Sequence, residues 1–153
     1  MSVQQNLGDC LARDAMGPDG GPDGGPDAAA GRVLFIEPAF GPEPRITTRS
    51  EFDAMCNGVA RGLLARGLVR GDRVAILSAN RAEYVAVFMG AMRAGLVPAP
   101  INHKLPRASA TQVVVDAGAR IVVHDAARAD DLDRSMLPGV AFVDFDAPGV
   151  GGF

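Results

Sequence analysis

Apolar and polar residues follow regular patterns from residue 31 onward, and these patterns predict the secondary structure. Runs rich in β-branched and aliphatic residues predict strands at 31–37, 45–48, 71–78, 96–102, 120–125 and 140–145. Apolar residues spaced three and four apart predict helices at 49–66, 81–94 and 106–117, with a shorter helix at 126–136. Because strands alternate with helices, we expect an α/β fold in which helices flank a mostly parallel sheet.

Residues near the helix ends support these boundaries. Thr48 stands three residues before Glu51, which is the spacing of a capping box, where each side chain bonds the other residue's backbone N–H. Asn80 and Glu83 repeat this spacing at the start of the next helix. Gly67 is placed to end the first helix in a left-handed turn.

Each of the two longer helices has one apolar face that is expected to be buried. In the first helix the face consists of Phe52, Met55, Cys56, Val59, Ala60, Leu63 and Leu64. In the second it consists of Tyr84, Val87, Phe88, Ala91 and Met92. Since Cys56 lies on the first face, we expect a buried and unreactive thiol.

The first 30 residues differ from the rest. A G-P-D-G unit repeats over 17–27, and such a sequence disfavours both helix and strand. Its three aspartates resemble a calcium loop only superficially, because a calcium site requires more oxygen ligands and a fixed frame. We therefore expect 1–30 to be a disordered Gly/Pro/Asp-rich tail.

Composition narrows the class of protein. The formal net charge is −3, so the chain lacks the basic excess that binds nucleic acid or anionic membranes. Two widely separated cysteines indicate neither a disulfide framework nor a metal cluster. No apolar run approaches a membrane span, and the first residues do not resemble a signal peptide. A cytoplasmic protein is expected.

The stretch from Gly31 to about Asp125 resembles the amino-terminal part of the AMP-forming adenylating enzymes, which include the acyl-CoA synthetases. Thirteen residues carry this resemblance, in the family's order and at comparable spacing: Gly71, Asp72, Arg73, Val74, Asn80, Glu83, Gly95, Pro98, Asn102, Lys104, Leu105, Asp116 and Gly118. Within the superfamily, "NHKLP" and "DAGARIVVHD" look more like acyl-CoA synthetases than peptide-synthetase domains.

The resemblance implies a reaction that uses ATP, Mg²⁺ and coenzyme A. A carboxylate attacks the α-phosphate of ATP to give an acyl-adenylate, and the thiol of CoA then takes the acyl group. The family holds ATP with a Ser/Thr/Gly-rich loop followed by lysine, yet no glycine in this chain precedes a lysine. We therefore expect residues 31–153 to be the amino-terminal part of an AMP-binding domain, truncated before the phosphate loop. Such a fragment is expected to be inactive alone, with no catalytic residue, metal site or bound cofactor of its own.

Lys104 is the one candidate site residue. It follows a predicted strand, together with Asn102, His103 and Arg107, and ligands collect beyond the carboxyl ends of parallel strands. The resemblance implies that Lys104 meets a phosphate of CoA. The alternative is an ordinary solvated turn in which Asn102 bonds its own backbone. His124, at the end of another strand, is expected to be structural or exposed to solvent.

Two other functions fit the sequence. The chain could be a free-standing binding or regulatory module that keeps the scaffold without the chemistry. It could also be an unrelated doubly wound domain that binds a nucleotide.

Overall fold

The computed structural model describes residues 31–38 and 43–147, so the predicted tail at 1–30 lies outside the described residues. The strands are β1 (Val33–Glu37), β2 (Arg45–Thr48), β3 (Arg73–Leu77), β4 (Val97–Ile101), β5 (Ile121–His124) and β6 (Ala141–Asp144). The helices are α3 (Arg49–Ala65), α4 (Ala82–Arg93) and α5 (Arg107–Ala117), with short 3₁₀ helices η3 (Ala126–Arg128) and η4 (Arg134–Met136).

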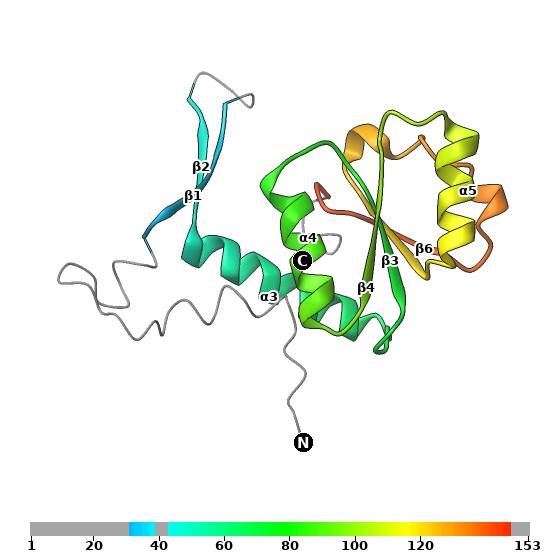
Figure 1. Cartoon of the computed structure of the whole chain (residues 1–153), viewed down its shortest axis with the longest axis horizontal. Coiled ribbons are helices and arrows are strands. Elements are labelled where there is room, and N and C mark those ends of the chain that lie inside the picture. The colour runs from blue at the N-terminus through cyan, green and yellow to red at the C-terminus, as the bar shows by residue number, and fades with distance from the viewer. Residues whose placement is uncertain (1–30, 39–42, 148–153) are drawn as a thin grey trace.

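Four of the strands form a parallel sheet in the order β4-β3-β5-β6. The chain crosses from β3 to β4 through α4 and from β4 to β5 through α5, so each of these connections is a βαβ unit. This confirms the predicted fold class. Figure 1 shows the arrangement in layers, with α5 on one face of the sheet and α3 and α4 on the other.

The central strand β3 is buried on both faces, as its unbroken apolar run predicts. Val74 and Ile76 pack with apolar residues of α3 and α4, whereas Ala75 and Leu77 pack with residues of α5. All four side chains are almost completely buried. The two hydrophobic clusters therefore meet at β3, which is the centre of the molecule.

β1 and β2 form a separate antiparallel pair, which stands apart from the parallel sheet in Figure 1. Ile36 pairs with Ile46, and Phe35 pairs with Thr47. The ring of Phe35 contacts the ring of Phe52 on α3 at a centroid distance of 5.0 Å. One face of this β1–β2 hairpin is thus joined to α3.

The predicted start of α3 is confirmed. The Thr48 hydroxyl accepts the N–H of Glu51 at 3.4 Å, and the Thr48 N–H donates to Oε2 of Glu51 at 2.8 Å. Residues Phe52, Cys56, Val59 and Leu63 of the predicted face are buried, but Leu64 is 48% exposed. The helix ends at Ala65, and Gly67 adopts a left-handed φ of 79° as predicted.

The predicted capping box of α4 is wrong. The residue at the cap position is Arg81, and its side chain makes no capping bond. Glu83 instead bonds two guanidinium groups, those of Arg45 and Arg81. Both partners of these hydrogen bonds are charged, so each bond adds ion pairing to hydrogen bonding.

A second face of α4, absent from the prediction, packs against α3. It consists of Ala82, Ala86 and Gly90, all of which are buried. A Cβ atom at Gly90 would lie 2.7 Å from both the carbonyl oxygen of Cys56 and the Cβ of Val59. The absence of a side chain at Gly90 therefore lets the two helices approach closely.

The single helix predicted at 126–136 is also wrong, because this segment forms η3 and η4 instead. Asp133 accepts the backbone N–H of Ser135 at 3.1 Å, and its own N–H donates to the Thr111 hydroxyl at 2.9 Å. Aspartate side chains compete with the helical backbone for such hydrogen bonds, and four of them lie between 125 and 133.

β4 and β6 are the edge strands of the parallel sheet. The N–H of Val97 donates to the carbonyl of Asp72 at 2.9 Å. The backbone N–H groups of Val97, Ala99 and Ile101 therefore point toward β3. Successive residues of a strand direct their N–H groups to opposite sides. Pro98 and Pro100 consequently lie on the outer edge of β4.

Candidate functional site

The four parallel strands end on the same side of the molecule, and the residues at and just after their carboxyl ends form the candidate site. We call this region the carboxyl edge. It consists of residues 78–81, 102–107, 124–128 and 144–147. Ligands of open parallel sheets bind beyond this edge, so it is the place where a functional group is expected.

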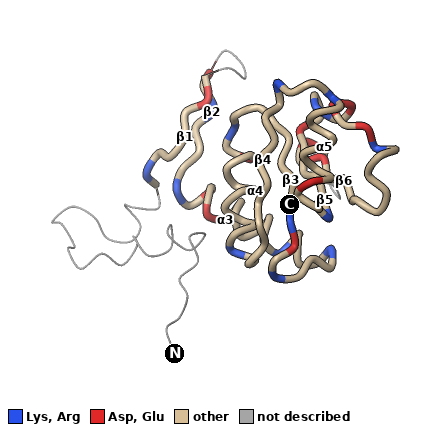
Figure 2. The backbone as a smooth tube through the Cα atoms, turned by 45° about the vertical axis from the view of Figure 1, so that its right-hand side comes forward, with Lys and Arg blue, Asp and Glu red and all other residues tan. Residues whose placement is uncertain are grey.

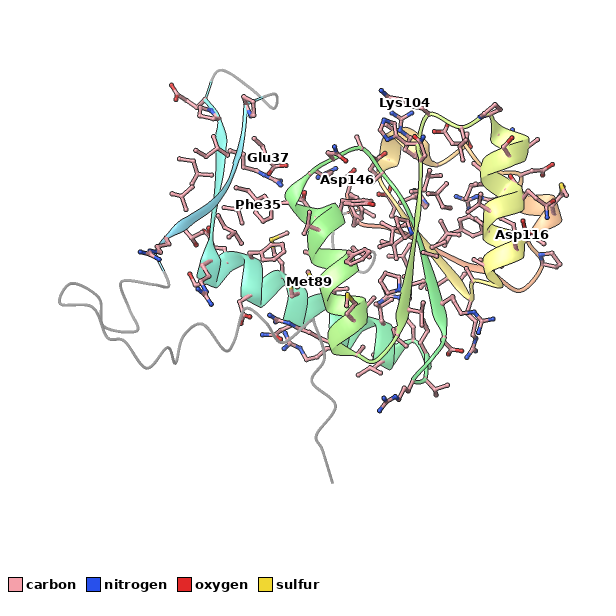
Figure 3. The ribbon with its side chains drawn as sticks, viewed as in Figure 1. Phe35, Glu37, Met89, Lys104, Asp116 and Asp146 are labelled. Atoms are coloured by element: carbon pink, nitrogen blue, oxygen red, sulfur yellow. The ribbon has the colours of Figure 1, made fainter. Side chains whose placement is uncertain are left out.

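Lys104 lies in a turn directly after β4. Its backbone N–H donates to Oδ1 of Asn102 at 3.0 Å, and the N–H of Leu105 donates to the Asn102 carbonyl at 3.1 Å. Figure 3 shows the Lys104 side chain pointing outward at the carboxyl edge, and the residue is exposed. Within the described residues its ammonium group has no hydrogen-bonding partner. The solvated turn in which Asn102 bonds the nearby backbone is thus present. It leaves the ammonium group of Lys104 accessible to a ligand.

Ser78 and Asp125 form a buried polar pair at the ends of β3 and β5. The Ser78 hydroxyl donates to Oδ2 of Asp125 at 2.8 Å, and the N–H of Ala79 donates to the same oxygen at 3.1 Å. Oδ1 of Asp125 has no hydrogen-bonding partner among the described residues. Sequence reasoning missed this pair. The available signal was a polar residue directly after each buried strand.

The two histidines have different surroundings. His124 is only 4% exposed, and its Nδ1 lies 2.9 Å from the carbonyl oxygen of Asp125. Its ring also packs near Phe142, at a centroid distance of 6.2 Å. These contacts support a structural role for His124, whereas His103 is half-buried in the turn before Lys104.

A chain of ion pairs connects the β1–β2 hairpin to the carboxyl edge. Arg45 of β2 pairs with Glu37 of β1 at 2.6 Å and also bonds Glu83, whose other partner is Arg81 at 2.8 Å. Arg81 in turn pairs with Asp146, after β6, at 2.8 Å. Figure 3 shows Glu37 and Asp146 on different sides of the start of α4.

Burial and hydrogen bonding act in opposite directions on Glu83. Burial opposes ionisation of its carboxyl group, but the hydrogen bonds from Arg45 and Arg81 outweigh burial and lower the pKa of Glu83 to about 2. The hydrogen bond to Glu83 correspondingly raises the pKa of Arg45. Glu83 is therefore ionised at neutral pH and holds the two arginines together.

Several residues that carry the family resemblance are structural and lie at the opposite end of the sheet. Asp72 accepts the N–H of Val69 at 2.8 Å and pairs with Arg120 at 2.8 Å. Arg73 donates to the carbonyl of Ala117 at 2.9 Å, and the left-handed Gly118 leaves room for its guanidinium. These contacts hold the amino-terminal ends of β3 and β5 together, and the residues that make them lie outside the carboxyl edge.

The described residues also limit the chemistry of the site. Among 31–38 and 43–147, no group of three His, Cys, Asp or Glu side chains is placed to hold a metal ion. Figure 2 shows acidic and basic positions interspersed along the described backbone. None of the helices in this part of the chain has the length and apolar character required to cross a membrane.

The chain is similar to part of several proteins named as CoA ligases. It is 35% identical over 86 residues to the long-chain-fatty-acid–CoA ligase FadD13 of Mycobacterium tuberculosis, a match that covers 56% of this chain and 17% of the relative. It is also 35% identical over 90 residues to a 3-hydroxybenzoate–CoA ligase of Aromatoleum sp., and this match covers 59% of this chain and 17% of the relative. The chain thus matches about a sixth of the length of these curated relatives.

Solved structures agree with this similarity. The N-terminal domain of FACL13 from Mycobacterium tuberculosis superposes with a TM-score of 0.72 at 25% identity, covering 93% of this chain and 34% of that one. The family described as AMP-binding enzyme matches residues 27–148, which is most of the chain. An unrelated doubly wound domain is thereby excluded, and the chain belongs to the AMP-binding enzyme family.

Proposed function

We propose that this chain forms the amino-terminal part of an ATP-dependent acyl-CoA ligase. The observation that carries the proposal is the family match over 27–148, in a chain that matches only 17% of the ligases it resembles. In the complete reaction a carboxylate attacks the α-phosphate of ATP and releases pyrophosphate. The CoA thiol then attacks the acyl carbonyl, and AMP leaves.

The chain alone is proposed to be inactive. Adenylate formation depends on groups that stabilise the charge developing on phosphate oxygens. No glycine in this sequence precedes a lysine, and the described residues hold no group of metal-ligating side chains that would fit Mg²⁺. The remaining polypeptide of the enzyme would therefore supply the ATP and Mg²⁺ sites.

Lys104 is proposed to contact a phosphate of CoA in the complete enzyme. Its exposed ammonium group lies at the carboxyl edge, in a turn ordered by Asn102. Lysine binds phosphate as a point charge, without the bidentate geometry of arginine. The contact would thus contribute to CoA affinity and leave the adenylation step unchanged.

Fatty acids are the substrate class that we propose first, with a role in cytoplasmic fatty acid metabolism. FadD13 supports this choice, while the 3-hydroxybenzoate ligase has the same identity and makes aromatic acids the competing class. A chimera in which residues 31–147 replace the matching segment of FadD13 tests whether this segment can serve in such a ligase.

Pyrophosphate release tests the proposed function. The isolated chain should release none from ATP with any carboxylate, whereas the FadD13 chimera should release it in a carboxylate-dependent manner. Release by the purified chain alone would refute the proposed inactivity. A chimera that folds but remains inactive with every acid would refute the assignment to a ligase.

A further inference from the structure

The turn between β4 and α5 is organised around one residue, Asn102. Residues 102–106 form this connection. Oδ1 of Asn102 accepts the N–H of Lys104 at 3.0 Å, and the carbonyl oxygen of Asn102 accepts the N–H of Leu105 at 3.1 Å. Both hydrogen bonds therefore end on Asn102, which makes this residue the anchor of the turn.

Both ends of this turn are fixed by other contacts. Ile101, just before the turn, is 3% exposed and packs with residues of α5. At the other end the N–H of Ala110 donates to the carbonyl of Pro106 at 2.9 Å, in the first turn of α5. Lys104 and Leu105 lie between these ends and are exposed, so packing contributes little to their position. The position of Lys104 therefore depends on the hydrogen bonds of the turn.

The two hydrogen bonds depend differently on the amino acid at position 102. The bond from Leu105 uses the main-chain carbonyl, so substitutions at this position keep it. The bond from Lys104 uses the side-chain oxygen, and Asn102→Ala would leave the Lys104 N–H without this acceptor. Removal of one side chain should thus release Lys104 while the strand, the helix and the bond from Leu105 stay in place.

We infer that Asn102 is a positioning residue for CoA, which holds the backbone of Lys104 while the ammonium group contacts phosphate. This inference rests on the proposed function. Lysine is a point charge on a flexible stem, and ordering such a group on binding lowers the affinity. Fixing its backbone before CoA binds reduces this cost. Asn102 itself is expected to make no contact with CoA, because its side-chain oxygen already accepts the Lys104 N–H.

Two thiol acceptors separate positioning from a general structural effect. In the FadD13 chimera, Asn102→Ala should raise the KM for CoA about five-fold, as expected for loss of one exposed hydrogen bond, and leave adenylation unchanged. Pantetheine has the same thiol arm as CoA but no phosphate, so its KM should not change. An equal rise for both acceptors would overturn the inference, and so would an unchanged KM for CoA.

Gln112→Ala is the matched control. Gln112 is exposed on α5, and its side chain also donates one hydrogen bond, to Oδ1 of Asp116 at 2.7 Å. The variant therefore loses a comparable bond without releasing Lys104, and its KM for CoA should equal that of the unaltered chimera. A rise as large as that of Asn102→Ala would show that the effect is not specific to the turn, and the inference would be wrong.

Coupling between Asn102 and Lys104 gives an independent test. Lys104→Ala alone is expected to raise the KM for CoA about ten-fold. Adding Asn102→Ala should change it no further, because no ammonium group is left to position. Independent contacts with CoA would instead multiply to about fifty-fold. That result would make Asn102 a direct ligand of CoA and overturn the inference.

Amide hydrogen exchange in the full 153-residue chain tests the positioning step without catalysis. Asn102→Ala should speed exchange of the Lys104 amide about five-fold, whereas Asn102→Asp keeps an acceptor oxygen and should retain slow exchange. Unchanged exchange in Asn102→Ala would contradict the inference. A chimera that ligates no acid would refute the proposed function instead, and the exchange rates would still decide whether Asn102 holds Lys104.

Discussion

Adding one methyl group at Gly90 would test how closely α3 and α4 are packed. The Cβ of Gly90→Ala would lie 2.7 Å from the carbonyl oxygen of Cys56 and from the Cβ and Cγ1 of Val59. An ordinary van der Waals contact begins at 3.4 Å, so the helices would have to separate by about 0.7 Å here. Two of the three atoms cannot rotate away, because one belongs to the backbone and another is a Cβ.

The expected cost follows from two opposing effects. Overpacking a core costs about 1–3 kcal/mol, and the upper end applies where backbone must move. Alanine restores about 1 kcal/mol through its higher helix propensity. The net loss is therefore about 2 kcal/mol in the free energy of unfolding, which corresponds to a decrease in Tm of about 8 °C.

Calorimetry or circular dichroism would measure this change. Gly62→Ala is the control for helix propensity, since Gly62 is a half-buried glycine of α3, and it should leave Tm unchanged or raise it. Val59→Ala should partly rescue Gly90→Ala by removing one of the clashing atoms, so the two changes should be non-additive. A Gly90→Ala variant that unfolds at or above the temperature of the unaltered chain would refute the close packing.

Two further predictions concern charged residues. Because the pKa of Glu83 falls from 4.5 to about 2 on folding, its stabilisation is complete above pH 4.5 and is lost as pH decreases toward 2. Urea unfolding should show a loss of at most about 2 kcal/mol between pH 6 and pH 3, and Glu83→Gln should remove most of this dependence. An unchanged pH profile would contradict the role of Glu83. In the FadD13 chimera, Lys104→Ala should raise the KM for CoA about ten-fold without slowing adenylation, while Lys104→Arg should retain CoA binding. If Lys104→Ala changes both half-reactions equally, or neither, the residue is only part of its turn.

The features that the sequence predicted well depend on neighbouring residues. The capping box of Thr48 and Glu51 spans three positions, and the left-handed glycine at 67 needs no distant partner. The buried run of β3 likewise indicates its central place in the sheet. The position of Lys104 after a strand was predicted for the same reason, whereas its contact with CoA stays a prediction.

The features that were missed depend on residues far apart in the chain. Glu83 has the spacing of a capping residue, but it bonds Arg45, which is 38 positions away. Ser78 and Asp125 are 47 positions apart and meet only because β3 and β5 are neighbours. The prediction of one helix at 126–136 was wrong because the spacing of apolar residues does not reveal the hydrogen bond between Asp133 and Thr111. Local patterns cannot identify these partners before the topology is known.

The two prolines of β4 affect which edge of the parallel sheet can pair with a further strand. A strand added to an edge needs N–H donors there, and the outer positions of β4 are Pro98 and Pro100, which have none. At the other edge, the alternate positions Phe142 and Asp144 of β6 keep their N–H groups. A further strand, whether from the same domain or from an aggregating neighbour, is therefore expected on the β6 side, because at β4 it would find no donor at Pro98 or Pro100.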